Sequence, residues 1–333
     1  MNYLKKYWYL VVIVVIGAGV MITATTRHKP RYPQQAQPPV AENPQATDIP
    51  ATTIVSESGV IPTNATVVFK ENTGDKTMTA VYLKDNIDGR EIYFATLPNI
   101  RKSYHPAEYH NGHIYILLRT GGDSGYETDP DWTDELWRYD VYGKREKIFS
   151  ARGLDFRVSD DESLIAVKAN ENYFILNSNG VTLKSFQKNE IVISSENYDA
   201  LQFNFLSWAP NIIWLNVTFG PSLVGLTKIN TVTFSVMKYD LLGKIYNGPD
   251  YSLNVANEKL AVSSYPAIFD VDSAQEFEQS KKNVDLIIYD LNTQKQTRIT
   301  SSRAKKFEPK WTNEMTLEYN DPISEGRLTY RFQ

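Results

Sequence analysis

Two kinds of short β-hairpin alternate along most of this chain, and their spacing limits the fold more than any other feature. In the first kind an apolar or aromatic strand, a tight polar turn and a short apolar strand follow one another, as in EYHNGHIYIL. The second kind falls between these hairpins, as in LWRYDVYGKREKIF, YFILNSNGVTLKSF, FSVMKYDLLGKIY and LIIYDLNTQKQTRI. Turns of the first kind recur at intervals of 50, 50, 46 and 56 residues and are centred at Asn111, Asp161, Asn211, Asn257 and Asn313. Two hairpins give four strands in each unit of about 50 residues, which is typical of a β-propeller blade.

This repeat predicts an all-β domain over residues 64–333 with five or six blades. A four-stranded sheet cannot bury both of its faces alone, so neighbouring blades must pack against it. The last strand, Arg327 to Phe332, has no hairpin partner after it, and we expect strands near Val67 to complete the final blade. The best helical segment, Ser273 to Lys281, is short and polar and fits an excursion between strands. A pair of β-sandwiches is the alternative, but it would not explain the regular alternation of hairpins.

The segment FEPKWTNEMTLEY, Phe307 to Tyr319, preceded by DLIIYDLNTQKQTRITSS, resembles the TolB-like, WD-like propeller repeat, in which a YDLxTGK hairpin leads into PxWSPDG. The segment Asp134 to Lys168 resembles it equally well, and the similarity covers most of residues 79–320. The resemblance implies a propeller fold. It implies no single function, because such propellers serve as scaffolds, as sensor ectodomains and as gating domains of peptidases. The SPDG turn is altered in every unit here, to HNGH, SDDE, APNI, VANE and TNEM.

An uncharged segment, Tyr7 to Thr26, precedes the repeat and has basic residues on both sides. Its length suits a hydrocarbon core of about 30 Å, so residues 1–27 are predicted to form a transmembrane anchor. A cleaved signal peptide is the alternative. Residues 28–63 are rich in proline and predict a disordered linker. Together these segments predict a single-pass membrane protein, held in the membrane by the Tyr7–Thr26 helix, with its propeller outside the cytoplasm.

Composition and motifs exclude several classes of function. The chain has no cysteine, which excludes disulfides, thiol nucleophiles and cysteine-ligated metals. Its formal net charge is −4 and it has no basic stripe, so we expect no nucleic-acid partner. No histidine follows His113 and no GxSxG motif occurs, which disfavours serine-hydrolase chemistry. Phosphate-binding and dinucleotide-binding glycine motifs are absent from the sequence as well.

An acidic loop, GGDSGYETDPDWTDELW, supplies the candidate metal site. Carboxylate oxygens in such a loop suit calcium, and the candidate ligands are Asp123, Glu127, Asp129 and Asp131. Their spacing matches neither an EF-hand nor an Asp-box, so a solvated loop is the alternative. We expect no other cofactor. Tyr126 and Trp132 in the same loop are candidates for contact with a protein partner.

Further residues could carry chemistry, although each also has a purely structural explanation. Three histidines, His105, His110 and His113, lie within nine residues, and the last two flank an Asn-Gly turn that could make them cross-strand neighbours. They fit either a metal site or an ordinary turn. The carboxylates that could converge in a propeller funnel are Asp155, Asp199 and Glu308. The tryptophans that could form either surface contacts or packing between blades are Trp208, Trp214 and Trp311.

These observations favour a membrane-anchored, non-catalytic β-propeller that binds or scaffolds a protein partner at the cell envelope, and not an enzyme. Loops on a rigid frame would supply the contacts. The alternative is a carbohydrate-active hydrolase or lyase with a carboxylate or calcium site in the propeller funnel. Converging acids would favour the enzyme, whereas an exposed patch at the rim would favour the scaffold.

Overall fold

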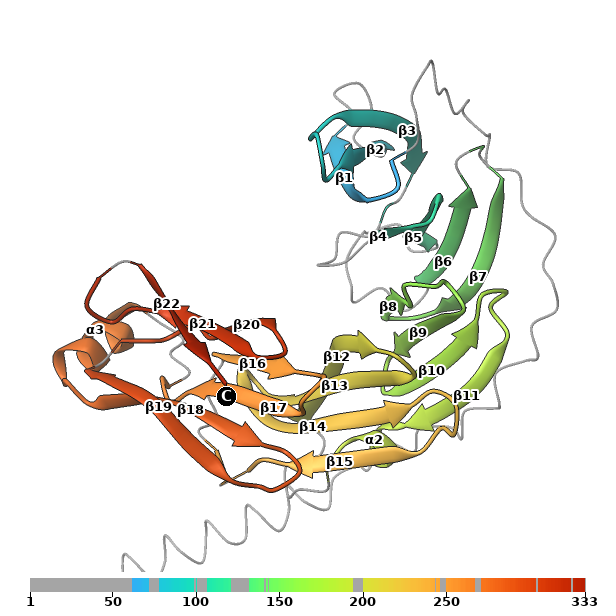
Figure 1. Cartoon of the computed structure of the whole chain (residues 1–333). Helices are drawn as coiled ribbons and strands as arrows, with labels where there is room; N and C mark the ends of the chain where they lie inside the picture. The colour runs from blue at the N-terminus through green and yellow to red at the C-terminus, as the bar shows by residue number, and fades with distance from the viewer. Residues whose placement is uncertain are drawn as a thin grey trace, which may run out of the picture. The chain divides into compact units, whose positions relative to one another are not determined.

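Six antiparallel sheets follow one another in chain order (Figure 1). The computed structural model of the chain describes residues 62–71, 78–98, 100, 107–120, 132–140, 142, 144–193, 200–242, 244–245, 250–266, 271–303, 305–324 and 326–332. Within these residues, strands form nearly all of the regular structure, and the all-β fold class is confirmed. Sheets of this kind, stacked one after another along the chain, are the units of a propeller-type fold.

The first sheet contains β1 (Ala65–Glu71), β2 (Met78–Asp85) and β3 (Glu91–Pro98). The second contains β4 (Ala107–His110), β5 (His113–Thr120), β6 (Thr133–Asp140) and β7 (Arg145–Ala151). The third contains β8 (Leu154–Val158), β9 (Leu164–Ala169), β10 (Asn172–Asn177) and β11 (Thr182–Gln187). The fourth contains β12 (Leu201–Ala209), β13 (Ile212–Phe219), β14 (Ser222–Asn230) and β15 (Val236–Asp240). The fifth contains β16 (Tyr251–Asn254), β17 (Lys259–Ser263), β18 (Asn283–Asp290) and β19 (Gln296–Arg303). The sixth contains β20 (Lys310–Asn313), β21 (Thr316–Asn320) and β22 (Arg327–Arg331).

The hairpins of the first kind are confirmed at all five predicted turns, which join β4 to β5, β8 to β9, β12 to β13, β16 to β17 and β20 to β21. In the part of the chain that the structure describes, two short helices lie between strands: α2 (Lys188–Ile191) and α3 (Val271–Gln279). The second of these confirms the predicted helical excursion, and it lies between β17 and β18. The residues that turn these hairpins are small or polar, as a tight connection between strands requires.

One hairpin of the second kind was wrongly placed. The predicted segment FSVMKYDLLGKIY is not a hairpin, because the fourth sheet closes with β14 and β15, whose turn runs from Asn230 to Ser235. The side-chain oxygen of Asn230 accepts hydrogen bonds from the backbone N–H groups of Val232 and Thr233, at 2.9 and 2.8 Å. An asparagine side chain that bonds the backbone two residues further on stabilises a turn. The turn signal is therefore Asn230, and β15, the last strand of the sheet, ends at Asp240.

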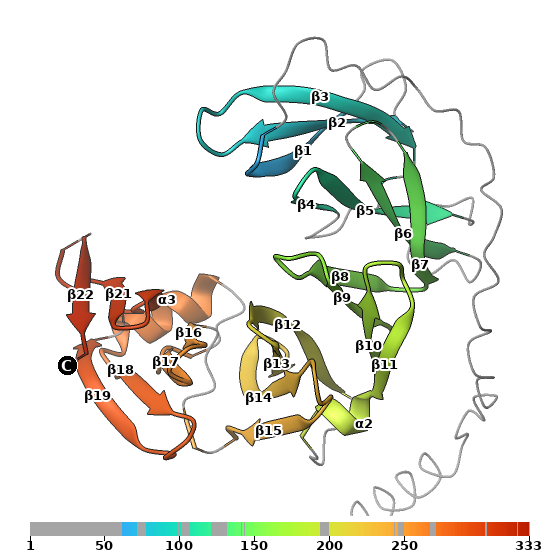
Figure 2. The same ribbon diagram turned by 45° about the vertical axis from the view of Figure 1, so that its right-hand side comes forward.

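Each pair of consecutive sheets encloses a hydrophobic core. The core between the third and fourth sheets, for example, includes Tyr173, Phe186, Phe203 and Leu215. The second sheet packs between two neighbours, so β5 is buried at five consecutive residues instead of alternating. Several first strands of successive sheets are neighbours: β4 lies beside β1 and β8 (Figure 2), and β16 lies beside β20 (Figure 1). Polar side chains of different sheets can therefore meet along these first strands.

The expectation that strands near Val67 complete the last sheet is wrong for the described residues. Strand β1 pairs with β2 in the first sheet, and β22 pairs with β21 in the sixth. The first sheet is instead anchored on the second, because β1 and its apolar side chains pack against β4 and β5. The local hydrophobic core therefore decides the pairing of these strands.

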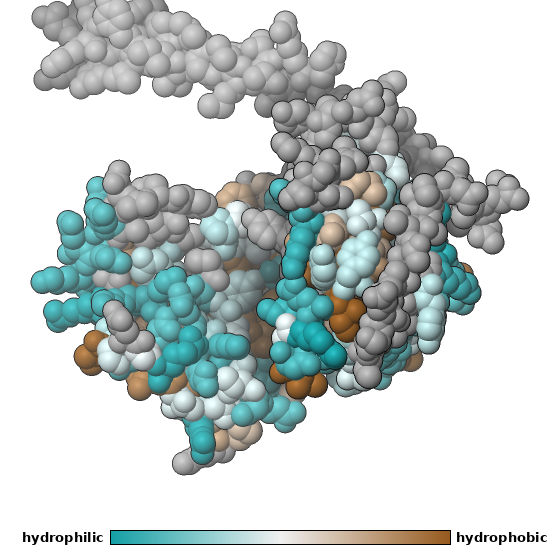
Figure 3. Space-filling model, turned by 90° about the horizontal axis from the view of Figure 1, so that it is seen from above, coloured by the Kyte–Doolittle hydropathy of each residue, from teal (hydrophilic) through white to brown (hydrophobic). Residues whose placement is uncertain are grey.

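The predicted single-pass localisation is corrected as well. The segment Tyr7–Thr26 lies outside the described residues, and no helix within them has the length and apolarity to cross a membrane. The face of the described residues seen in Figure 3 is largely hydrophilic, with apolar residues at separate positions. Among the described residues, the most exposed large apolar side chains lie in hairpin turns: Ile87, Tyr142, Val232 and Ile323.

Candidate functional site

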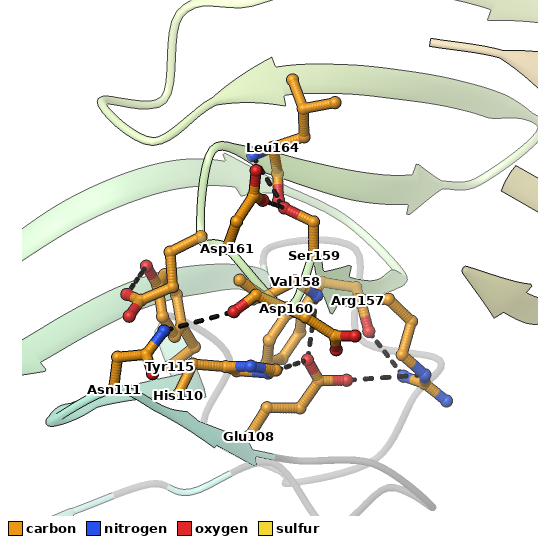
Figure 4. Close-up of polar contacts among 12 residues, drawn as sticks. Glu108, His110, Asn111, Tyr115, Arg157, Val158, Ser159, Asp160, Asp161 and Leu164 are labelled. Atoms are coloured by element: carbon orange, nitrogen blue, oxygen red, sulfur yellow. Dashed lines mark hydrogen bonds and ion pairs between the residues drawn. The ribbon is translucent and has the colours of Figure 1, made fainter. Parts of the chain in front are cut away.

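A cluster of polar side chains lies where the second sheet meets the third (Figure 4). Four members come from strands β4 and β5, and the others come from β8 and from the turn between β8 and β9. We call this group the hairpin cluster, and its members are Glu108, His110, His113, Tyr115, Arg157 and Glu162. Because β4 and β8 are neighbours, the two hairpins face each other across the contact between the sheets.

Glu108 joins the two sheets. It points from β4 toward β8 (Figure 4), and its Oε2 accepts hydrogen bonds from the backbone N–H of Val158, at 2.9 Å, and from Nε2 of His110, at 3.1 Å. Its Oε1 lies 3.5 Å from Nε of Arg157. A carboxylate only accepts, so Nε2 of His110 carries the hydrogen and Nδ1 is left to exchange a proton with a ligand.

Glu162 forms the second half of the cluster from the opposite hairpin. Its φ of 56° is in the left-handed region, which turns its side chain back to the second sheet. Its Oε2 accepts a hydrogen bond from the hydroxyl of Tyr115, at 2.8 Å. The same oxygen lies 2.9 Å from Nδ1 of His113, an ion-pair distance without the alignment of a hydrogen bond. Burial, followed by the bond to Glu162, raises the pKa of the Tyr115 hydroxyl, which therefore remains a donor.

The turns that carry these groups are built from local polar contacts. His110 and His113 flank a two-residue turn in which Asn111 and Gly112 have φ of 40° and 92°, as a hairpin of this length requires. The two imidazoles are therefore directly opposed across the strands, and such side chains share one face of the sheet. Nδ2 of Asn111 also donates to the carbonyl oxygen of Asp160, at 3.2 Å, and so ties the two turns together.

The opposite turn is fixed by Asp161. Its Oδ1 accepts hydrogen bonds from the hydroxyl groups of Ser159 and Ser163, at 2.7 and 2.8 Å. The bond from Ser159, with those from Ser163, lowers the pKa of the Asp161 carboxyl. Glu162, the next residue, therefore extends from a rigid turn.

Polar contacts continue from the hairpin cluster along β8. Nη1 of Arg157 lies 3.2 Å from Oδ1 of Asp155, and its guanidinium carbon lies 5.4 Å from the centre of the Phe205 ring on β12. Asp155 is directly opposite Lys168 on β9. A row of charged groups therefore runs from Glu108 of the second sheet along the third sheet, and it contacts the fourth sheet at Phe205.

Most residues proposed for a metal or a partner lie outside the described residues: Asp123, Tyr126, Glu127, Asp129 and Asp131, together with His105 and Asp199. Trp132 is described and is only 7% exposed; the guanidinium groups of Arg119 and Arg152 lie 4.2 and 5.2 Å from its ring centre. Within the part of the chain that the structure describes, no three histidine or carboxylate side chains are grouped to hold a metal ion.

The other candidates are separated by the fold. Glu308 lies before β20, where it pairs with Lys306 and accepts a hydrogen bond from Nδ2 of Asn320. These contacts place it in the sixth sheet, whereas Asp155 lies on β8 in the third. The ion pair with Lys306 is the main reason that the pKa of Glu308 is lowered. Two of the tryptophans pack between sheets, as their structural explanation expects. Trp214 is fully buried, and Nε1 of Trp311 donates to the carbonyl oxygen of Ser252 on β16.

Sequence reasoning missed Tyr115, Arg157 and Glu162 as site residues. A signal for them was present, because their contacts join residues one repeat unit apart. The separations are 50 residues for Glu108 and Val158, 49 for Asn111 and Asp160, and 47 for Tyr115 and Glu162. Comparing each turn with the same position one unit later would have paired the two hairpins.

No protein-family model and no curated protein matches the sequence. Solved structures with a similar fold include an oligogalacturonate lyase in complex with manganese, at 11% identity and a TM-score of 0.46, covering 77% of this chain and 73% of the other. The dipeptidyl peptidase 4 of Porphyromonas gingivalis is 12% identical, with a TM-score of 0.45, covering 80% and 43%. The acylaminoacyl peptidase of Pyrococcus horikoshii is 10% identical, with a TM-score of 0.40, covering 77% and 40%.

These structures are all enzymes, which corrects two expectations at once: that the chain is a non-catalytic scaffold and that it is not an enzyme. The manganese belongs to the lyase structure. At such low identity the likeness assigns neither a substrate nor a catalytic residue to this chain.

Proposed function

We propose that the chain is a carbohydrate-active hydrolase or lyase whose acid–base groups are the two carboxylate–imidazole pairs of the hairpin cluster. The observation that carries the proposal is the opposition of His110, held by Glu108, and His113, beside Glu162. Imidazole exchanges protons near neutral pH, and a neighbouring carboxylate orients it and stabilises its protonated form. Two such pairs on one face supply a base and an acid together.

In the lyase reaction, His110 would take the proton from the carbon next to the carboxylate of an acidic sugar. The electron pair of that C–H bond forms a carbon–carbon double bond as the bond to the leaving sugar oxygen breaks, and His113 gives that oxygen a proton. In the hydrolase reaction, His110 would take the proton of an attacking water, and His113 would again protonate the leaving oxygen. Both imidazoles are partly exposed, with 20% and 38% of their side chains accessible.

Glu258 provides a matched control for this site. It lies in the turn between β16 and β17 with φ of 51°, and its carboxylate pairs with Lys228 and accepts a hydrogen bond from the hydroxyl of Tyr239, at 3.1 Å. Glu162 makes the same kind of contact to Tyr115, but only its cluster contains histidines. A change at Glu258 therefore disturbs the packing of sheets without touching the proposed acid–base groups.

The full chain should be tested on polysaccharides and oligosaccharides, including oligogalacturonates, the substrate in the name of one similar structure. Unsaturated products detected by ultraviolet absorbance indicate a lyase, and new reducing ends without that absorbance indicate a hydrolase. We expect His110→Asn and Glu162→Gln to lower kcat by about 100-fold or more, and Glu258→Gln to leave it unchanged. Equal losses for Glu162→Gln and Glu258→Gln, or no product from any substrate, would reject the proposal.

Two finer proposals accompany this one. The six sheets are proposed to be six propeller blades. The loop over residues 121–131 is proposed to bind calcium through Asp123, Glu127, Asp129 and Asp131, and to contact a protein partner through Tyr126. Isothermal titration of the full chain with calcium tests the first role of the loop, and the Asp129→Asn and Asp131→Asn variants should abolish the heat if it is right.

A further inference from the structure

Lys168 is a partly buried cation whose charge no described carboxylate pairs with. Its Nζ donates to the carbonyl oxygen of Phe203, at 2.7 Å, and to Oδ1 of Asn204, at 3.0 Å, both of which are neutral groups on β12. The Phe203 ring lies under the ammonium group, 4.9 Å away. Buried charges in proteins are normally paired with an opposite charge. The missing counter-charge at Lys168 therefore needs an explanation.

Other lysines of the described residues show what a satisfied environment looks like. Lys188 lies 2.9 Å from Glu171, and Lys147 lies 3.0 Å from Glu135. Lys238 donates to the carbonyl oxygens of Asn189 and Val192, at 2.8 and 3.0 Å, where it meets the negative C-terminal end of α2. Lys168 has neither a carboxylate partner nor a helix end.

The charged groups around Lys168 leave its ammonium available. Asp155 is opposite it across β8 and β9, but that carboxylate accepts hydrogen bonds from Arg157 and from the backbone N–H of Phe156. Burial lowers the pKa of Lys168, Asp155 opposes this shift, and the positive charge of Lys188 adds to it. An anion placed at Lys168 would remove this cost.

We propose that Lys168 and the amide nitrogen of Asn204 bind the carboxylate group of an acidic sugar. Lysine only donates, so it fixes Oδ1 of Asn204 as the acceptor and leaves Nδ2 as a second donor for the ligand. Lys168 is opposite Asp155, and Arg157 links Asp155 to Glu108, so this subsite lies along β8 from the hairpin cluster. The inference rests on the proposed function and deepens it: the substrate is a uronate-containing oligosaccharide.

The test is a binding titration of the full chain with trigalacturonate, a trisaccharide of guluronate and a hyaluronan oligosaccharide, each at low and high salt. The methyl ester of trigalacturonate serves as the neutral counterpart. Lys168→Met removes the charge and keeps most of the stem, Lys168→Arg keeps the charge, and Lys238→Met is the control with the same two-acceptor contact. For the acidic sugar that binds, we expect Lys168→Met to raise Kd by about 10- to 100-fold. Lys168→Arg should restore part of the affinity, and Lys238→Met should change nothing.

The inference is overturned if the wild-type chain binds none of the acidic sugars, if the ester binds as tightly as the acid, or if Lys168→Met binds as the wild type does. Two variants distinguish failure of this inference from failure of the proposed acid–base reaction. His110→Asn should lose turnover and keep its affinity, whereas Lys168→Met should raise KM much more than it lowers kcat. If the chain binds acidic sugars through Lys168 but converts none of them, the subsite proposal stands and the proposed enzymatic function is rejected.

Discussion

Removing one hydroxyl group from the protein's interior should make it more stable. Tyr173 is 1% exposed, and its hydroxyl has no hydrogen-bond partner among the described residues. The side chain packs in the core between the third and fourth sheets, with its ring 6.3 Å from that of Phe203. Burial, the first cause, also raises the pKa of this hydroxyl. We therefore predict that Tyr173→Phe stabilises the fold.

The magnitude follows from the cost of an unpaired polar group. A buried donor without a partner costs about 1 to 3 kcal/mol, and phenylalanine avoids this cost while keeping the ring in place. Removing the oxygen leaves a small cavity, which reduces the gain in stability by a few tenths of a kcal/mol at about 24 cal/mol per Å³ of cavity volume. The expected net gain in the free energy of unfolding is about 1 to 2 kcal/mol. In a domain of this size that raises Tm by about 2 to 4 °C per kcal/mol.

Tyr115 offers the matched control, because it is equally buried but its hydroxyl is bonded. Its ring is fully buried, and the hydroxyl donates to Glu162 at 2.8 Å. A hydrogen bond to a charged acceptor contributes about 1.5 to 3 kcal/mol, so Tyr115→Phe should lower the free energy of unfolding by that amount. Urea unfolding of the full chain, followed by fluorescence and circular dichroism, measures both variants. A loss of stability in Tyr173→Phe comparable with that of Tyr115→Phe would refute the reasoning and show that the Tyr173 hydroxyl has a partner.

Three other predictions test separate parts of the fold. Asp134 is fully buried and accepts from Arg119 and from a backbone N–H, so Asp134→Ala should cost about 3 to 5 kcal/mol in urea unfolding. A Cβ at Gly180 (φ 78°) would lie 2.3 Å from the carbonyl oxygen of Ile148, so Gly180→Ala should lower Tm much more than Gly112→Ala (φ 92°), which meets nothing within 4 Å. Burial raises the pKa of Asp250, with Lys306 opposing the shift, so the ionised carboxylate costs stability once the pH rises above its ordinary pKa of about 3.9. Asp250→Asn should therefore be more stable than the wild type at pH 7 and equally stable near about pH 3, as pH-dependent thermal unfolding can show.

The regular parts of the fold were predictable because local turn chemistry repeats. Asn111, Asp161, Asn211, Asn257 and Asn313 all mark turns of the expected hairpins. Asp161 and Asn313 accept backbone N–H bonds two residues ahead, and Asn111 and Asn211 have φ of 40° and 58°, so these turn signals are local. The same chemistry explains the error in the fourth sheet, where both Asn230 and Asp240 accept backbone N–H bonds two residues ahead. Only packing decides which of two such turns lies inside a sheet.

The pairing of the first strands was less predictable for a different reason. Sequence periodicity indicates that a strand near Val67 exists, but it does not indicate which sheet the strand joins. Val67 and Phe69 pack against the apolar residues of the second sheet, and this local burial outweighs the expected closure with β22. Burial of apolar surface contributes about 25 cal/mol per Å² in any sheet. Two pairings of the same strand that bury similar areas therefore differ little in free energy, and the sequence does not distinguish them.

The candidate site illustrates the same limit on the scale of single residues. Two turn glutamates, Glu162 and Glu258, adopt the same backbone conformation and bond a tyrosine of the preceding sheet. Their repetition is what a structural contact between sheets requires, and it carries no chemistry by itself. The difference lies in their neighbours, since Glu162 meets an imidazole and Glu258 meets the ammonium of Lys228. An imidazole can accept a proton at one ring nitrogen and donate one from the other, whereas the ammonium group of lysine only donates. Activity that depends on Glu162 and not on Glu258 would therefore arise from the imidazoles and not from the packing that both glutamates share.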